Sequence, residues 1–207
     1  MISCMTERDK TIFDIIDKHY PEEISFLPVI SPFRFLITVM LSASTTDRQA
    51  EKAAEALFSV FPDEKAIASA DVSEIEVLIR SAGLSKAKSR NIKGTAEAVS
   101  VSGIPDTMAG LMSLPGVGEK TASCYMHSIL NRPAVIADTH FVRVAARLGF
   151  TDTVDRNKSA KEIRERFPEN MWSRLSMALN LHGRVVCHAK PDCQSCPVSA
   201  ICPSSEA

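Results

Sequence analysis

The chain has 207 residues, of which 45% are hydrophobic and 24% are charged, and this composition excludes a disordered protein and suits one large or two small domains with a buried core. A formal net charge of -1 excludes a generally basic protein, so any affinity for nucleic acid must come from local patches. No apolar run approaches the length of a membrane span and the N-terminus carries no secretion signal, so we expect a cytoplasmic protein.

The first quarter of the chain predicts helices. Residues 7–19 place isoleucine and phenylalanine at spacings that give a short helix one apolar stripe. Ser31 and Pro32 form a helix-start signal, and residues 33–41 are apolar nearly all round, which predicts a buried central helix. Small polar residues at 42–47 then interrupt the apolar run. On sequence alone, we interpret them as a polar connection to the next helix, which a threonine or aspartate can cap.

A basic segment follows two further short helical segments. Gly83 suits the end of a helix, and residues 83–96 contain basic side chains but no acidic one. Their spacing places most of them on one helix face. They are Lys86, Lys88, Arg90 and Lys93. A solvated helix face and a phosphate-binding face both fit this pattern.

The most informative stretch is Leu114-Pro115-Gly116-Val117-Gly118-Glu119-Lys120. A proline and two glycines force a sharp turn, and a helical pattern follows at residues 119–130. The turn therefore lies at a helix N-terminus, where bare N–H groups and the helix dipole favour an anion such as phosphate. It is not a nucleotide P-loop, because four residues do not separate the glycines and no Gly-Lys-Ser/Thr ends the run. The alternative is a turn that only joins two core helices.

Two ionisable residues stand out near this turn. Lys120 lies in the first turn of the predicted helix, where the dipole favours acidic side chains, so a local rule is broken without a visible structural gain. Such breaks often mark function, and a solvated lysine is the alternative. Asp138 follows an apolar run and precedes another helical pattern, so it suits a helix N-cap, and a functional role is compatible with capping.

The remaining pattern favours an all-α fold. Residues 135–137 are apolar and short enough for a strand, but nothing else in the chain alternates with period two. Helices are expected near 105–114, 119–130, 139–148, 157–166 and 170–184.

Four of the six cysteines fall within sixteen residues, at Cys187, Cys193, Cys196 and Cys202. Without a secretion signal a reducing compartment keeps thiols reduced, so the pattern predicts four thiolates on one metal centre. Zinc and an iron–sulfur cluster both remain open, because a single Cys-x-x-Cys pair fits either.

Residues 114–122 and 136–144, with the cysteine cluster, resemble the endonuclease III family of DNA glycosylases with lyase activity, and a weaker likeness begins near residue 25. The resemblance implies a two-domain, all-α helix-hairpin-helix glycosylase fold. Residues 25–133 would form a six-helix domain, and residues 1–24 with 134–207 a helical domain whose four clustered cysteines bind [4Fe-4S]. It also implies a monomer, associated with the nucleoid, that acts on double-stranded DNA with a damaged base or an abasic site and not on membranes.

The resemblance assigns catalytic roles as well. Lys120 would attack the sugar C1′ and form a Schiff base, and Asp138 would stabilise positive charge on the sugar and help deprotonate Lys120. Leu84 would wedge into the duplex at the lesion. The candidate DNA contacts are Ser44, Leu84, Lys88, Leu114, Gly116, Val117, Gly118, Arg143 and Arg184.

Three departures from the family pattern are visible: two lie where the lesion is read and affect specificity, and the third is a shorter cysteine gap that we expect the loop to absorb. Ser44 replaces a glutamine, Ser85 replaces an aromatic residue, and the first cysteine gap has five residues instead of the usual six. From the resemblance we expect a bifunctional glycosylase and lyase that removes oxidised pyrimidines. The alternatives are a thymine-mismatch glycosylase and a non-catalytic helix-hairpin-helix DNA-binding protein. Adenine-mismatch glycosylases are rejected, because they lack the hairpin lysine and carry a catalytic glutamate where this chain has Thr38.

Overall fold

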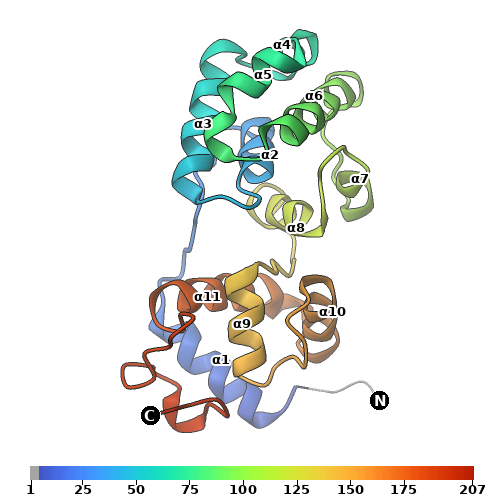
Figure 1. Cartoon of the computed structure of the whole chain (residues 1–207). Helices are drawn as coiled ribbons and strands as arrows, with labels where there is room; N and C mark the ends of the chain where they lie inside the picture. The colour runs from blue at the N-terminus through green and yellow to red at the C-terminus, as the bar shows by residue number, and fades with distance from the viewer. Residues whose placement is uncertain (1–4) are drawn as a thin grey trace. The chain divides into compact units, whose positions relative to one another are not determined.

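The structure is a computed structural model that describes residues 5–207. Figure 1 shows that its regular elements are helices, and no strand occurs within the described range, so the all-α expectation is confirmed. The apolar residues 135–137 lie in an extended connection that pairs with no other segment as a sheet. None of the helices between residues 5 and 207 is long and apolar enough to cross a membrane.

The described chain forms two compact units. One unit combines the residues up to Ser25 with Pro133–Ala207, and the other spans Phe26–Arg132. Each has its own hydrophobic core, as expected for independent packing units.

The unit Phe26–Arg132 is built around one buried helix. Its elements are α2 (Pro32–Leu41), α3 (Asp47–Val60), α4 (Glu64–Ser69), α5 (Val72–Leu78), the 3₁₀ turn η1 (Arg80–Ala82), α6 (Ser85–Ser102), α7 (Met108–Met112) and α8 (Glu119–Ser128). Helix α2 starts where Ser31 Oγ accepts a hydrogen bond from the Arg34 N–H at 3.3 Å. Eight of its ten residues are buried, and it packs against α3, α6 and α8. The predicted central helix is therefore confirmed.

The other unit joins both ends of the chain. It contains α1 (Glu7–His19), α9 (Thr139–Arg147), α10 (Arg156–Arg166), η2 (Glu169–Met171), α11 (Trp172–Val185) and η3 (Ser199–Ile201). Ile12 and Ile16 of α1 are completely buried in the same core as Phe141 of α9. The buried carboxylate of Asp9 pairs with Arg166 at 2.8 Å, which ties α1 to the end of α10.

The first hairpin helix is shorter than expected. The sequence predicts residues 105–114, whereas α7 spans Met108–Met112. Thr107 is the reason for the late start, because its Oγ1 caps the helix by accepting from the Gly110 N–H at 3.1 Å. The other predicted helices agree with α8, α9, α10 and α11 to within two residues at each end.

Candidate functional site

The hairpin between α7 and α8 presents backbone at its turn. Gly116 adopts φ +75°, a left-handed conformation that glycine takes without steric cost. Thr95 of α6 donates from its hydroxyl to the Pro115 carbonyl at 2.8 Å, which fixes the turn against α6. Gly118 caps α8 and has no side chain to satisfy the helix terminus. The first N–H groups of α8 have no carbonyl partner within the helix, so this end is suited to an external anion.

The two apolar residues of the hairpin turn belong to the core. Leu114 and Val117 are both buried, and the Val117 N–H donates to the Leu114 carbonyl at 3.1 Å. The side chains therefore offer no contact surface, and the expected DNA contact at Leu114 and Val117 stays a prediction for the backbone of the turn. They position the glycine backbone by packing behind it.

Lys120 lies in the first turn of α8 and is half-buried. Its ammonium donates to Ser42 Oγ at 3.3 Å, and the Ser42 hydroxyl donates in turn to the Val39 carbonyl at 2.8 Å. Ser42 is the C-cap of α2. The lysine side chain is thus directed toward the polar connection after the buried central helix. This contact was not predictable from local patterns, because the two residues lie 78 positions apart.

Asp138 is the N-cap of α9, as its sequence context predicts. Its Oδ1 accepts hydrogen bonds from the N–H groups of His140 and Phe141, both at 2.8 Å. Its Oδ2 lies 3.9 Å from Nη2 of Arg184. One carboxylate oxygen therefore holds the side chain in place, and the other faces a cation. Asp138 belongs to the unit that contains Pro133–Ala207, and Lys120 belongs to Phe26–Arg132.

Three exposed non-glycine residues of the unit Phe26–Arg132 have left-handed backbones, and one of them, Asn131 at φ +51°, lies after α8 near the end of the unit. Ser44 has φ +58°, and Leu84 has φ +50° with a side chain that is 66% exposed. Such conformations are uncommon outside glycine, cost about 1–2 kcal/mol per residue and tend to occur at functional sites. Each follows the end of an element, Ser44 after α2 and Leu84 after η1.

The proposed phosphate contact of Lys88 is contradicted by the structure. Lys88 is only 7% exposed, and its ammonium donates to the carbonyls of Leu41 at 2.8 Å and Ala82 at 2.7 Å. Lys93 is similarly engaged, with a 2.7 Å hydrogen bond to the Ala70 carbonyl. The predicted basic face is thus reduced to its two exposed members, because half of its charges satisfy carbonyls inside the unit.

Arg143 and Arg147 help to fix the cysteine loop. The Arg143 guanidinium donates to the carbonyls of Gly183 at 2.8 Å and Cys187 at 3.1 Å. Arg147 donates to the Cys187 sulfur at 3.3 Å and to the Ala189 carbonyl at 3.0 Å. Arg143 was expected to contact DNA, whereas the structure gives the side chains of both arginines partners within their own unit.

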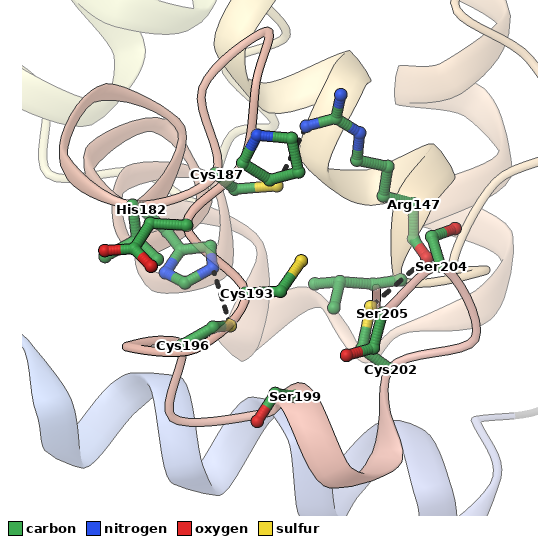
Figure 2. Close-up of a pocket in the computed structure, with 13 residues that line it drawn as sticks. Arg147, His182, Cys187, Cys193, Cys196, Ser199, Cys202, Ser204 and Ser205 are labelled. Carbon is green, nitrogen blue, oxygen red and sulfur yellow. Dashed lines mark hydrogen bonds between the residues drawn. The ribbon is translucent and has the colours of Figure 1, made fainter. Parts of the chain in front are cut away.

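All four clustered cysteines line one pocket. Figure 2 shows Cys187, Cys193, Cys196 and Cys202 around this pocket, with His182 and Arg147 at its edge. None of the four forms a disulfide. Among residues 5–207, no three His, Cys, Asp or Glu side chains are grouped closely enough to be recognised as a single-ion site.

The donor set of this pocket suits a cationic centre. Burial raises the pKa of the Cys196 and Cys202 thiols, and the neighbouring cysteines raise both pKa values further. Four thiolates side by side therefore repel one another unless a metal centre neutralises them. The cysteines consequently fit a thiolate-bound metal group better than a set of free anions.

A buried histidine connects the cysteine pocket to α1. The Tyr20 hydroxyl lies 2.7 Å from Nδ1 of His182, and the other ring nitrogen lies 3.6 Å from the Cys196 sulfur. Burial, followed by the charge of His19, lowers the pKa of His182 to about 4. Burial, followed by Cys196 and Cys187, raises the pKa of Tyr20 to about 12. Both groups are therefore neutral near pH 7, and sequence spacing did not indicate their contact.

Comparison with known proteins agrees with this fold and hairpin. A family model described as "HhH-GPD superfamily base excision DNA repair protein" matches residues 37–169. Endonuclease III from Synechocystis sp. is 35% identical over 206 residues, which cover 97% of this chain and 94% of that protein. Two solved structures, a non-covalent endonuclease III–DNA complex and a trapped endonuclease III–DNA covalent intermediate, are each 31% identical. Their TM-scores are 0.89 and 0.88, with 97% of both chains covered in each case.

The helical fold, the glycine hairpin and the family match define a helix-hairpin-helix protein of base excision DNA repair. Two endonuclease III proteins match almost the whole chain at more than 30% identity. The chain therefore belongs to the endonuclease III family, and it is a DNA glycosylase.

Proposed function

We propose that this glycosylase removes oxidised pyrimidines from double-stranded DNA and then cleaves the abasic strand by β-elimination. The observation that carries the proposal is the position of Lys120, a half-buried lysine in the first turn of the helix that follows the glycine hairpin. A lysine there opposes the helix dipole, so its presence does not help to stabilise the helix. A role in the reaction explains the lysine better. The likeness to an endonuclease III trapped as a covalent DNA intermediate supports the same assignment.

Lys120 acts as the nucleophile in this proposal. Its Nζ attacks the sugar C1′ as the free amine, and the electron pair of the glycosidic bond leaves with the base, which takes up a proton. The nitrogen then passes one proton to the ring oxygen as the C1′–O4′ bond breaks and the sugar ring opens, which leaves a protonated Schiff base between Nζ and C1′. Removal of a proton from C2′ expels the 3′ phosphate and cleaves the strand. Hydrolysis of the Schiff base restores the amine.

Asp138 supplies negative charge to this reaction. Because its Oδ1 is held by two backbone N–H groups, the carboxylate needs little reorganisation when positive charge develops on the sugar. The same carboxylate assists in taking the proton from Lys120. Removing such a preorganised group lowers a rate by roughly 100- to 1000-fold.

DNA binding and base extrusion use the unit Phe26–Arg132. The hairpin glycines bring the N-terminus of α8 close to a backbone phosphate, and Leu84 enters the base stack as an apolar wedge. Its 66% exposure and left-handed backbone support this role. Ser44 occupies the space that the extruded nucleotide leaves, and a base must be extruded before its sugar can be attacked. Arg184 contacts a phosphate in this proposal.

The four clustered cysteines hold a [4Fe-4S] cluster in this proposal. The cluster supplies positive charge that neutralises four thiolates and anchors the loop after α11. Cys193→Ser should therefore lose iron and acid-labile sulfide, whereas Cys124→Ser, which lies outside the pocket, should retain both. Zinc in place of iron in anaerobically purified protein, or unchanged iron in Cys193→Ser, would refute the assignment.

Borohydride trapping tests the proposed reaction. The wild type, Lys120→Ala and Asp138→Asn are each incubated with duplexes that carry one oxidised pyrimidine, one G·T mismatch or one bare abasic site. Lys65→Ala, an exposed lysine of α4, serves as the control for loss of a lysine from the same unit. We expect a covalent adduct on the oxidised pyrimidine and the abasic site with the wild type and the control, none with Lys120→Ala, and slow formation with Asp138→Asn.

The substrates separate the remaining functions. An adduct or base release only on the G·T duplex would replace the proposal with thymine-mismatch repair. This alternative remains because the serines at positions 44 and 85 depart from the family pattern. Base release without any adduct would indicate a glycosylase without lyase activity. Binding to all three duplexes without bond cleavage, by protein that retains its metal, would leave a non-catalytic DNA-binding role.

A further inference from the structure

We propose that Lys88 is a positioning residue that holds the two DNA-opening loops of the unit Phe26–Arg132 in one fixed arrangement. The first loop is residues 42–46, which contain Ser44; the second is residues 83–87, in which Gly83 and Leu84 connect η1 to the first turn of α6. The roles of these loops rest on the proposed function, whereas the clamp itself rests on contacts within a single unit.

The Lys88 ammonium joins the ends of two elements. Its Nζ lies 2.8 Å from the carbonyl of Leu41, the last residue of α2, and 2.7 Å from the carbonyl of Ala82, the last residue of η1. Carbonyls at a helix C-terminus have no partner within the helix, and the negative end of the helix dipole favours a cation there. One lysine therefore satisfies the terminal carbonyls of two helical elements, which lie 41 residues apart, at positions 41 and 82.

Each clamped carbonyl directly precedes a strained loop. Leu41 is followed three residues later by Ser44 at φ +58°, and Ala82 is followed by Gly83 at φ +67° and Leu84 at φ +50°. Left-handed conformations of non-glycine residues persist only where surrounding contacts hold them. Both loops carry exposed tips, and the Lys88 ammonium restrains each loop at its base.

The burial of Lys88 argues against an incidental contact. Transferring an ammonium to a protein interior is costly unless hydrogen bonds replace its water, and Lys88 is only 7% exposed. Burial also lowers its pKa. A methionine would fill a similar space without the cost of burying a charge. The charge of Lys88 is therefore explained by its two hydrogen bonds, which hold the bases of the two loops.

The clamp is separable from the attachment of Lys120. Ser42, whose hydroxyl accepts from Lys120, also donates to the Val39 carbonyl at 2.8 Å, and its N–H donates to the Thr38 carbonyl at 3.0 Å. These anchors lie within α2 and do not involve Lys88. Ser42 is the first residue of the loop 42–46, but its own anchors lie in α2, so loss of the clamp should loosen the rest of that loop and leave Ser42 in place to support Lys120.

Helix α6 provides a matched control. Lys93 lies five positions after Lys88 on the same helix and donates to the Ala70 carbonyl at 2.7 Å. Ala70 is the C-cap of α4, and the adjoining segment carries neither opening loop. Lys93→Met thus removes one charged hydrogen bond to a carbonyl, together with a 3.9 Å ion pair to Glu97, at a place where no effect on opening is expected.

Amide hydrogen exchange on the full, metal-loaded chain tests the clamp without reference to activity. Lys88→Met should raise exchange in both residues 43–46 and residues 83–87 by at least about tenfold, since loss of a charged hydrogen bond is worth that much in a local opening equilibrium. Lys93→Met should leave both segments unchanged. If Lys88→Met does not fold, Lys88→Gln, which keeps two N–H donors, should give an intermediate rise. No rise in the folded variant beyond that of Lys93→Met would overturn the proposal.

Activity measurements test whether the clamp serves base opening. Lys88→Met should slow excision of an oxidised pyrimidine from a paired duplex by about tenfold or more, while cleavage at a preformed abasic site changes by less than about threefold. Equal losses on the two substrates would overturn the role in opening. If the wild type excises no base at all, the proposed function fails, and the exchange measurement still decides whether Lys88 clamps the loops.

Discussion

The glycines of the hairpin turn offer a sharp test of why this segment has its sequence. Gly116 has φ +75°, and a Cβ added there would lie 2.7 Å from both the Cβ and the Nδ2 of Asn91. Gly118 has φ -92°, and an added Cβ would meet nothing within 4 Å. We therefore predict that Gly116→Ala destabilises the protein strongly, whereas Gly118→Ala is nearly neutral.

Two separate effects set the magnitude. A left-handed alanine costs about 1–2 kcal/mol, and forcing a methyl group into a packed site adds about 1–3 kcal/mol. The contact with Asn91 cannot be relieved by a change of rotamer, because the Cβ of Asn91 is fixed to the backbone of α6. Gly116→Ala should accordingly lower the free energy of unfolding by about 2–5 kcal/mol.

Denaturant unfolding, followed by circular dichroism, measures this difference. In the Asn91→Gly background the steric part should disappear, so the cost of Gly116→Ala should fall to about 1–2 kcal/mol. If Gly116→Ala and Gly118→Ala have the same stability within about 0.5 kcal/mol, the conformational argument for this turn is incorrect. An unchanged cost in the Asn91→Gly background would instead reject the clash.

Three further substitutions test the other unit. Burial acts to raise the pKa of Asp9, but hydrogen bonds from Arg166 and Thr6 outweigh it and hold that pKa below its usual range. The stability that this carboxylate contributes is therefore fully present above its pKa in the unfolded chain. It is lost as the pH falls through its pKa in the folded protein. Asp9→Asn should destabilise at neutral pH and lose less stability on acidification, and a parallel pH profile would contradict this. Gly183→Ala should cost about 1–3 kcal/mol in thermal unfolding, because its Cβ would lie 2.9 Å from His140 Cβ, and a stabilised variant would refute that close approach. Phe141→Ala should cost about 3–5 kcal/mol in the same assay, because the ring is completely buried, and a loss below about 1 kcal/mol would show that the core does not depend on it.

Local patterns predicted the helices and their starts well. Thr46 accepts from the Gln49 N–H at 3.3 Å and Asp138 caps α9, as their positions before helical segments suggested. Such signals act over three or four residues, so they are visible in a sequence. The glycine hairpin was similarly recognisable from adjacent residues alone.

Contacts over long sequence separations were not predictable. Lys88 was expected on a phosphate-binding face, because a lysine on an amphipathic-looking helix gives no sign that two carbonyls lie within its reach. The contact between Tyr20 and His182 spans 162 positions and follows only from packing of α1 against α11. Residue type indicates what a side chain is able to bind, whereas tertiary packing decides which partner it meets.

The discontinuous unit has a consequence for synthesis on the ribosome. Helix α1 is translated well before the rest of its unit, because the residues that bury Ile12 and Ile16 come from segments after Pro133. At the usual pace of translation, the whole of Phe26–Arg132 is made in between, which leaves the apolar side of α1 uncovered for seconds. Once Arg132 has been made, the nascent chain carries the complete unit Phe26–Arg132 and helix α1 without its packing partners. A chaperone that shields short apolar helices would protect α1 until the last helix is released.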